Sequence, residues 1–375
     1  MEKDKTIKTF TIDISKLVPG LVLANDLIND KTGAVIIPAG TMISNRHLKR
    51  INTFGISGVC VVCDPKDVDL NLEDAGEIWA KVKIKPLPQT INEQSKKIYL
   101  ETFGTIRKFF KRDQSIDETG VREIMAAAVN ISDEILRDPY VLPQIAVLKA
   151  IDNYTYSHSL NVAIYATTLA RFLGYKARIL KEICLAGLMH DIGKLDIPKQ
   201  IVDKPGLFTQ EEFAIMKKHA WYSAERLKNI KNISANIIAA VSQHHEKMNG
   251  TGYNIGLRNT QIHDWASILA IADVYDALTT TRTYRKALLP HEGAEIIMGS
   301  TIDHLDYIKV KVFIREMPFY PMGTRVVLST GKTGCVVSRQ NASPLRPIVQ
   351  VDGEFNQIID LAQDLTTFIT AIINK

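Results

Sequence analysis

The sequence has 375 residues, of which 46% are hydrophobic and 23% are charged, as in a soluble globular protein with two or three domains. A formal net charge of +5 is too small at this length to indicate a surface that coats a nucleic-acid polymer. No apolar run reaches the roughly 18 residues of a membrane-spanning helix, and the first ten residues lack the apolar segment of a signal peptide. We therefore expect a cytoplasmic protein without a membrane segment.

Residues 1–64 are predicted to form a small β-rich module with no catalytic or metal cluster. The expected elements are strands at 10–14, 21–24 and 34–37, turns at Pro19-Gly20 and Thr32-Gly33, and a short helix at about 45–53. The next strand carries Cys60 and Cys63 in a C-x-x-C pattern. Residues three apart on a strand face opposite sides, and no second C-x-x-C occurs, so a plain strand is favoured over a redox pair or half a zinc site.

Residues 65–130 are predicted to form a linker and a helical stalk. Charged residues and prolines are mixed up to about residue 90, as in linkers. Two amphipathic helices follow, with apolar stripes at Ile91, Ile98, Phe103, Ile106 and Phe110, and at Val121, Ile124, Ala128, Ile131 and Ile135. Packing into a core explains such stripes. A homodimer through the stalk is the alternative, although the stripes are too short to indicate a coiled coil.

Residues 140–308 are almost continuously helical by pattern, whereas residues 309–375 are predicted to form a β-rich extension. In the helical region Thr209 and Glu212 have the spacing of a capping box at a helix start. In the extension we expect a hairpin around Gly331, a further strand within 347–353, and a final helix. The fold class is therefore multidomain, with a mainly α central domain between small β-rich units.

Histidines are concentrated in the helical region. Five of the nine lie between residues 158 and 245, where uniform placement would put about two. They are His158, His190, His219, His244 and His245, and the carboxylates of Asp191 and Asp273 accompany them. Imidazole and carboxylate together suit divalent iron, manganese or zinc. Hydrogen-bonded core histidines are the alternative, which a single histidine would favour but this combination does not.

The surroundings of these residues also favour metal binding. His190 and Asp191 end an apolar helix that starts near residue 177, where burying an unpartnered polar pair would be costly. Adjacent helical residues point about 100° apart, so such neighbours indicate two ions, with the carboxylate bridging them. Asp273 lies among small apolar residues, where a lone carboxylate would be destabilising. Asp276 is expected to support a ligand or cap the helix, and Glu246 either orients a histidine or lies in solvent.

These motifs, in this order, resemble an HD-GYP domain, a branch of the HD phosphohydrolase superfamily, over roughly 131–308. The matching motifs are HD at 190–191, GK at 193–194, KPG at 204–206, His219, HHE at 244–246, GTGY at 250–253 and DVYDALTTTRTYR at 273–285. The resemblance implies a helical bundle that hydrolyses the bacterial second messenger cyclic di-GMP.

The resemblance also implies a role for each matching position. The implied metal ligands are His158, His190, Asp191, His219, His244, His245 and Asp273, with Asp191 bridging. Asp191 and Lys194 are the implied catalytic residues, and Lys194 would lie near the reacting phosphate. The implied substrate-binding residues are Gly252, Tyr253, Arg282 and Arg285. The alternatives are a solvated helix end for the two arginines and loop packing for Tyr253.

Two positions depart from the family pattern. Some members have a glutamate that helps to bind a third metal where this sequence has Tyr154, and a neutral phenol is a poor ligand. We therefore expect two divalent ions, iron or manganese, and linear pGpG as the main product, with slower conversion to GMP. Asn254 replaces the proline of the family name, which predicts a freer loop and altered substrate or partner binding without loss of the metals.

Three functions follow from these residues. The first is a cyclic di-GMP phosphodiesterase, and the second is a hydrolase of another cyclic dinucleotide. The third is a degenerate domain that binds a nucleotide or a signalling protein without turnover. Degeneration usually removes metal ligands, and none of the matching ligands is missing, so the third function ranks below the other two.

Overall fold

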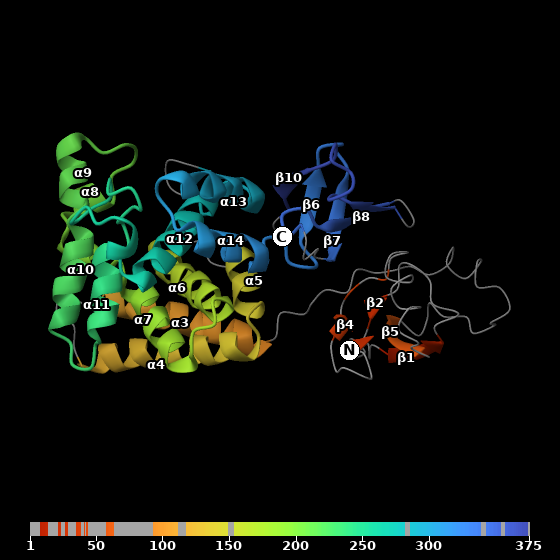
Figure 1. Ribbon diagram of the computed structural model, residues 1–375, viewed down its shortest axis with the longest axis horizontal. Coiled ribbons are helices and arrows are strands. Elements are labelled where there is room, and N and C mark those ends of the chain that lie inside the picture. Colours follow the sequence, from red (N-terminus) through yellow and green to blue (C-terminus); the bar gives the residue numbers. More distant parts are fainter. Residues whose placement is uncertain are drawn as a thin grey trace. The chain divides into compact units, whose positions relative to one another are not determined.

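The computed structural model divides into two compact units, Gln89–Pro321 with Asn341–Leu345 and Thr370–Lys375, and Met1–Pro88 with Met322–Gln340 and Arg346–Ile369. The structure describes residues 8–13, 22–23, 27–28, 35–38, 41, 43, 58–63, 93–111, 118–148, 154–281, 286–338, 343–353 and 357–373. Figure 1 labels most of the helices and strands of both units.

The first unit is helical, as the sequence predicts for 131–308. Its α-helices are α3 (Glu93–Lys111), α4 (Glu118–Arg137), α5 (Val141–Leu148), α6 (Tyr154–Phe172), α7 (Ala177–Met189), α8 (Lys199–Val202), α9 (Gln210–Met216), α10 (His219–Lys228), α11 (Ala235–Gln243), α12 (Asp264–Thr279), α13 (Pro290–Gly299) and α14 (Tyr307–Glu316). Short 3-10 helices are η2 (Ile192–Asp196), η3 (Asn259–Gln261) and η4 (Ser300–Ile302). The predicted capping box is confirmed, because Thr209 and Glu212 exchange both bonds at the start of α9.

Helix α6 lies at the centre of this unit, with α7 and α12 packed along it (Figure 1). Every side chain from Ser157 to Ala170 is buried, as expected for a helix covered on all sides. α6 and α7 approach so closely at Gly187 that a Cβ there would lie 2.6 Å from the Cα of Ala163. This close crossing brings the first turn of α6 near the end of α7, where the metal-ligand candidates are found.

Helices α3 and α4 confirm the two predicted amphipathic helices. α3 packs against α4 and α6, and α4 packs against α7. In α4 the predicted stripe is buried at every position, from Val121 to Ile135. The α4 stripe is thus covered by helices of the same chain, which confirms the packing interpretation for this helix. In α3 only Ile106 of the predicted stripe is buried, Ile98, Phe103 and Phe110 are half-buried, and Ile91 lies outside the described residues. The homodimer through the stalk stays a prediction.

The N-terminal strands are β1 (Lys8–Asp13), β2 (Val22–Leu23), β3 (Leu27–Ile28), β4 (Val35–Ile37) and β5 (Gly58–Cys63). They form an antiparallel sheet in the order β1-β5-β2 and a β3-β4 pair. The three predicted strands are confirmed with slightly shifted bounds, and the strand that contains Cys60 and Cys63 is confirmed as β5. The two-residue strand β3 was not predicted because it is too short to show a pattern. The predicted helix at 45–53 and the linker lie outside the described residues.

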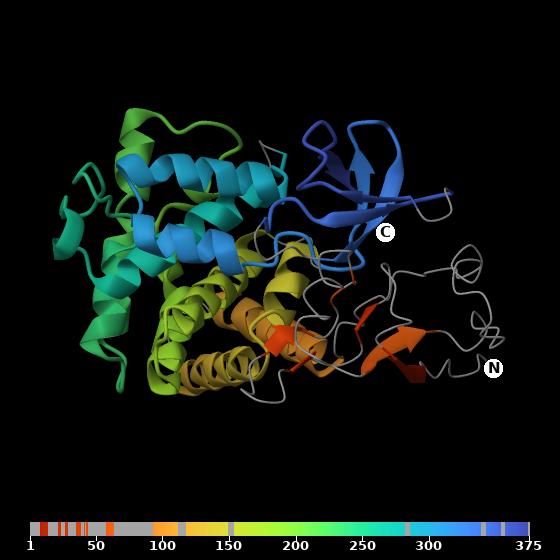
Figure 2. The same ribbon diagram turned by 45° about the vertical axis from the view of Figure 1, so that its right-hand side comes forward.

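The C-terminal strands are β6 (Arg325–Leu328), β7 (Thr333–Ser338), β8 (Ile348–Val351), β9 (Ile358–Asp360) and β10 (Ile369–Ile372). They form one sheet in the order β10-β6-β7-β8-β9, seen in blue in Figure 2. The hairpin is confirmed, with Gly331 at φ 78° in its turn. The prediction of a final helix is wrong. Residues 369–372 form the strand β10, because the tail is rich in β-branched Thr and Ile. No helix among the described residues is both long and apolar enough to cross a membrane.

Candidate metal centre

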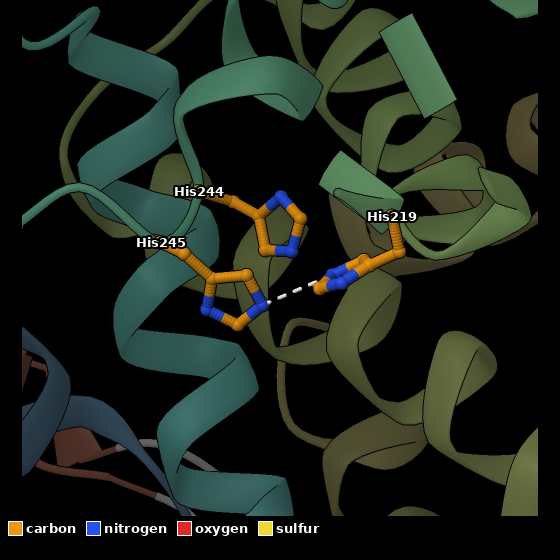
Figure 3. A group of neighbouring side chains, drawn as sticks. All are labelled: His219, His244 and His245. Carbon is orange, nitrogen blue, oxygen red and sulfur yellow. Dashed lines mark hydrogen bonds between the residues drawn. The ribbon is translucent and has the colours of Figure 1, made fainter. Parts of the chain in front are cut away.

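The structure brings the predicted metal ligands together from the ends of several helices. His158 lies in the first turns of α6, His190 and Asp191 follow α7, and His219 begins α10. The remaining ligands are His244 and His245, which follow α11, and Asp273 in α12. Figure 3 shows that His219, His244 and His245 point their rings toward one another across two segments. All except His245 are buried.

Three of these histidines are oriented in the same way. The Nδ1 atoms of His190, His219 and His244 lie 2.7, 2.7 and 2.6 Å from the carbonyl oxygens of Gly187, Met216 and Val241. Each acceptor lies in the last turn of a helix, where carbonyls lack an intrahelical partner. With Nδ1 donating, each ring presents a Nε2 lone pair, which is the atom that a metal requires. The sequence position of each histidine, just after a helix, therefore fixes its tautomer.

His158 is oriented by a carboxylate instead. Its Nδ1 lies 2.7 Å from Oδ2 of Asp276, which is fully buried. Its Nε2 lies 3.1 Å from Oδ1 of Asp273 and 3.6 Å from Oδ2 of Asp191. A carboxylate behind a ligand histidine raises its basicity and holds its ring. Asp276 thus holds the ring of His158, which is the position expected of a residue that supports this ligand candidate.

Asp191 lies between two groups of histidines. Its Oδ2 is 3.3 Å from Nε2 of His190, and its Oδ1 is 3.3 Å from Nε2 of His219. Lys194 approaches the same carboxylate, with Nζ 2.5 Å from Oδ2. One carboxylate therefore faces both groups, which is the arrangement that bridging two cations requires.

The buried atoms of this cluster test whether it fits a metal. Nε2 of His190, Nε2 of His244 and Oδ1 of Asp191 are buried and make no hydrogen bond within the described part of the chain. Buried polar atoms without partners are costly and rare, and here they converge. Three sets of ligand atoms lie within 4.8 Å of one another: His219, His244 and His245; His158, His190 and Asp273; and His190, Asp191 and His244. The residues therefore fit divalent cations.

The motif glycine Gly193 positions the two sides of the cluster. A Cβ at Gly193 would lie 2.1 Å from the carbonyl oxygen of His219 and 2.3 Å from the amide nitrogen of Ser223. The Gly193 amide donates to Oγ of Ser223 at 2.8 Å. The segment η2 can thus lie directly on α10, which brings Asp191 and Lys194 up to His219. Sequence reasoning gave Gly193 no role, although its place between Asp191 and Lys194 was a usable signal.

Tyr253 packs on the cluster rather than standing apart from it. The centroid of its ring lies 4.7 Å from that of the His245 ring, with an angle of 31° between the two ring planes. The centroid of the Phe213 ring lies 6.4 Å away. Burial, together with the negative charges of Asp273 and Asp191, raises the pKa of Tyr253, so its hydroxyl stays neutral. The neighbouring Gly252 is required, because a Cβ there would lie 2.5 Å from the Glu246 Cα. The loop therefore presses Tyr253 against His245.

Glu246 has a different role from both predicted ones. It is buried, and its carboxylate accepts hydrogen bonds from the backbone amides of Ile255, Gly256 and Leu257, at 2.7 to 3.2 Å. It neither orients a histidine nor lies in solvent. The three amides could not be foreseen, because they face Glu246 only when the loop folds back. Glu246 thus fastens the loop to the end of α11.

Asn254 adds a second attachment. Its side-chain Nδ2 donates to the carbonyl of Ser242 at 3.0 Å, and the Tyr253–Asn254 peptide bond is cis. The loop is therefore attached at both Glu246 and Asn254, and the freer loop stays a prediction.

Three predicted positions cannot be placed. Arg282 and Arg285 lie outside the described residues, after the end of α12 at Thr279. The side chain of Tyr154, at the start of α6, also lies outside them.

The charges of the cluster depend on burial and on neighbours. Burial opposes the ionised form of Asp191, but the charges of Lys194 and His190 hold the pKa of this carboxyl well below its usual value. Burial lowers the pKa of His158, but its hydrogen bonds to Asp273 and Asp276 raise that pKa to about 9. Burial lowers the pKa of His245 to about 3 and that of His244 well below 6.5. His244 and His245 are therefore neutral beside the ionised carboxylate of Asp191, whereas His158 is protonated at neutral pH and would release that proton on binding a metal.

Protein stripped of metal by a chelator is expected to lose stability as pH falls from 6.5 to 4.5. His244 and His245 stay neutral in the folded state, whereas in the unfolded state they bind protons below about 6.5. Each of these two histidines should lower the free energy of unfolding by about 1.4 kcal/mol for every pH unit below about 6.5. The raised pKa of His158 in the folded state stabilises the protein, but this stabilisation is complete below about pH 6.5 and no longer changes with pH there. It therefore cannot offset the loss of stability caused by His244 and His245. Urea unfolding at several pH values measures the slope.

The matched variant is His245→Gln, which should flatten this slope because it removes one of the two histidines that stay neutral in the folded state. Equal stability at pH 6.5 and 5.5 would show that the buried histidines are not neutral in the folded state.

The segment that contains this cluster is similar to known proteins. Residues 142–307 match the family model of the HD domain. The chain is 36% identical over 240 residues to a cyclic di-GMP phosphodiesterase of Pseudomonas aeruginosa, covering 64% of this chain and 56% of that protein. It is 34% identical over 202 residues to a 3′3′-cGAMP-specific phosphodiesterase of Vibrio cholerae, covering 54% and 44%.

Among solved structures, an HDG"Y"P protein from Bdellovibrio bacteriovorus aligns with a TM-score of 0.47 and 17% identity, over 82% of this chain and 98% of that one. The chain spans about half the length of the curated relatives named above.

Proposed function

Because residues 142–307 match the family model of the HD domain, we propose that this chain is a metal-dependent phosphodiesterase that hydrolyses cyclic di-GMP to linear pGpG. The observation that carries the proposal is the convergence of buried, unpartnered ligand atoms from His190, His244 and Asp191. Such atoms are costly unless a cation binds them. We further propose that 131–308 is the catalytic domain, that 65–130 is a linker and helical segment, and that 1–64 and 309–375 are accessory units.

The cluster supports two ions, iron or manganese, rather than one. His219, His244 and His245 form one set, and His158, His190 and Asp273 form another, with Asp191 facing both. Mixed imidazole and carboxylate ligands suit these metals. Bound there, the ions would supply positive charge that neutralises the phosphodiester and lowers the pKa of the attacking water.

The protein residues then orient the ligand and handle the proton of the leaving group. Hydrolysis forms a bond from the water oxygen to phosphorus and breaks the bond from phosphorus to the 3′ oxygen, which must gain a proton. Lys194 lies at the edge of the cluster, 2.5 Å from Asp191 and 29% exposed. From there its ammonium can neutralise charge on the phosphoryl oxygens and donate a proton to the 3′ oxygen.

Tyr253, Gly252, Arg282 and Arg285 are the proposed substrate residues. Tyr253 keeps a neutral hydroxyl and its ring is backed by His245, so it can donate a hydrogen bond or stack on a base without moving. Gly252 provides the close backbone approach that brings Tyr253 there. The two arginines are supported by their residue type alone. A guanidinium group can donate two parallel hydrogen bonds to a phosphate or to the edge of a guanine.

The second candidate substrate is 3′3′-cGAMP. Relatives named for this dinucleotide are 34 to 35% identical to the chain, close to the 36% of the cyclic di-GMP enzyme. A domain that only binds a nucleotide or a signalling protein has less support, because all seven proposed metal ligands are present and their ligand atoms lie close together in three sets.

Product analysis tests this proposal. Full-length protein loaded with Mn²⁺ or Fe²⁺ is incubated with cyclic di-GMP, 3′3′-cGAMP and cyclic di-AMP, and the products are separated by chromatography. We expect pGpG to appear from cyclic di-GMP first, and GMP more slowly. Faster cleavage of 3′3′-cGAMP than of cyclic di-GMP would make 3′3′-cGAMP the proposed substrate and leave the proposed mechanism unchanged. Bound metal with no cleavage of any of the three would contradict the enzyme proposal.

An Asn254→Pro variant is expected to change KM for the dinucleotide more than metal content. Proline removes the bond from the Asn254 side chain to Ser242, but no metal-ligand candidate contacts that bond. Asn254→Ala is the matched variant, since it removes the bond without adding a ring. Steady-state kinetics and metal analysis on both variants measure the effect. A loss of metal with unchanged KM would contradict this division of the motif.

A further inference from the structure

A series of hydrogen bonds runs from α3, which precedes the HD domain, to the ligand His158. The hydroxyl of Tyr99 in α3 donates to Oδ1 of Asn161 in α6 at 3.0 Å. Nδ2 of Asn161 donates to Oδ1 of Asp276 in α12 at 2.9 Å. The other oxygen of Asp276, Oδ2, accepts a hydrogen bond from Nδ1 of His158 at 2.7 Å. Three helices are thus joined by one polar path inside an apolar core.

We propose that Tyr99 and Asn161 are positioning residues for the metal centre, which act through Asp276 on His158. This inference rests on the proposed metal site. It adds a contribution from α3, which lies outside the matched segment 142–307.

The path is fully enclosed and its donors and acceptors are matched. Tyr99, Asn161 and Asp276 are 1%, 2% and 0% exposed. Oδ1 of Asp276 accepts from Asn161 and also from Thr280, at 3.1 Å, which leaves Oδ2 for the imidazole. A carboxylate held at one oxygen cannot rotate, so it holds the plane of the His158 ring.

Tyr99 fixes the orientation of the amide in this path. Burial, together with the charge of Asp276, raises the pKa of Tyr99, so its hydroxyl keeps its proton and serves as a donor. A donor at this point requires the amide oxygen of Asn161 to face Tyr99 and the amide nitrogen to face Asp276. Without the hydroxyl, the buried Oδ1 of Asn161 would lose the donor it has here, and the amide would be held at one end only.

Neighbouring tyrosines show that packing alone does not require such bonds. The hydroxyls of Tyr165 and Tyr275 are buried in the same helical unit and make no hydrogen bond within the described residues. Tyr165 lies in α6, four residues from Asn161, and is 1% exposed. It offers a matched control, because Tyr165→Phe removes a buried hydroxyl of the same kind that is not part of the path.

Manganese binding by metal-stripped, full-length protein tests the proposal. The dissociation constant of Mn²⁺ is measured by competition with a chelator for the wild type, Tyr99→Phe, Asp276→Asn, the double variant and Tyr165→Phe. We expect Asp276→Asn to weaken binding by about 10- to 100-fold, as for a residue that orients a ligand. Tyr99→Phe should weaken it by about 3- to 10-fold, since it acts at one remove. Tyr165→Phe should leave it unchanged.

The double variant separates positioning from a general loss of stability. If Tyr99 acts through Asp276, then Tyr99→Phe adds less than about twofold once Asp276 is replaced. Equal weakening in Tyr99→Phe and Tyr165→Phe, or full additivity in the double variant, would overturn the inference. A wild type that binds no Mn²⁺ would instead refute the proposed metal site. Melting temperatures of the metal-free variants verify that each is folded.

Discussion

An Asp191→Asn variant is expected to lose about a thousandfold or more of kcat and to retain less than half of the bound metal. Asparagine has nearly the same shape, but it offers one neutral oxygen where the carboxylate offers two charged ones. In the structure the two oxygens face Nε2 of His219 and Nε2 of His190, both at 3.3 Å. An amide group would have to direct its N–H toward one of these lone pairs or toward a cation. Turnover of cyclic di-GMP and metal analysis by mass spectrometry provide the two measurements.

Asp196→Asn is the matched control for this variant. Asp196 ends the short segment η2, which begins directly after Asp191, but its carboxylate binds the guanidinium of Arg226, at 2.5 and 2.7 Å. Losing part of a partly exposed ion pair should cost at most about 1 kcal/mol of stability and no metal. If Asp191→Asn kept its metal and its rate, Asp191 could not be the bridging ligand.

A Gly193→Ala variant is expected to lose both stability and metal. The added methyl carbon would lie 2.1 Å from the His219 carbonyl and 2.3 Å from the Ser223 amide, and both of these are backbone atoms. Segment η2 must therefore move away from α10, which separates Asp191 from His219. Overpacking of this kind costs about 1–3 kcal/mol or more. Thermal unfolding with and without Mn²⁺ should show a lower melting temperature and a smaller stabilisation by the metal.

Gly104→Ala is the control for the same substitution elsewhere. Gly104 lies within helix α3, with no atom within 4 Å of the position that a Cβ would take. Alanine there should raise stability by up to about 1 kcal/mol, because it favours the helix. Unchanged metal stabilisation in Gly193→Ala would mean that the spacing of η2 and α10 does not control the cluster.

Much of the helical unit could be predicted because its helices have a regular spacing of apolar residues and typical capping residues at their ends. The stripe from Val121 to Ile135 and the capping box at Thr209 are local patterns, and the structure confirms both. The final helix failed for a related reason: in a short tail, apolar residues fit either periodicity. There the β-branched residues and the pairing with β6 decide for a strand.

The seven ligand candidates could be predicted because histidine and aspartate are costly in apolar helices unless something binds them. Their supporting residues could not be predicted in the same way. Asn161 and Tyr99 look like ordinary helix residues until the fold places them beside Asp276. Glu246 looked like a partner for its neighbours in sequence, yet it binds amides nine to eleven residues further on. Such roles depend on contacts between segments, which no local pattern records.

The helices that end at the cluster also determine the order in which ligands can arrive. α7 and α11 stop at His190 and His244, so the negative ends of both helix dipoles face the same space as the carboxylates of Asp191 and Asp273. This field attracts cations and repels anions. A dinucleotide with two phosphates meets a repulsive site until the ions have reversed its sign. Under the proposed function, metal uptake would therefore have to precede nucleotide binding, and protein without metal would be both inactive and empty of nucleotide.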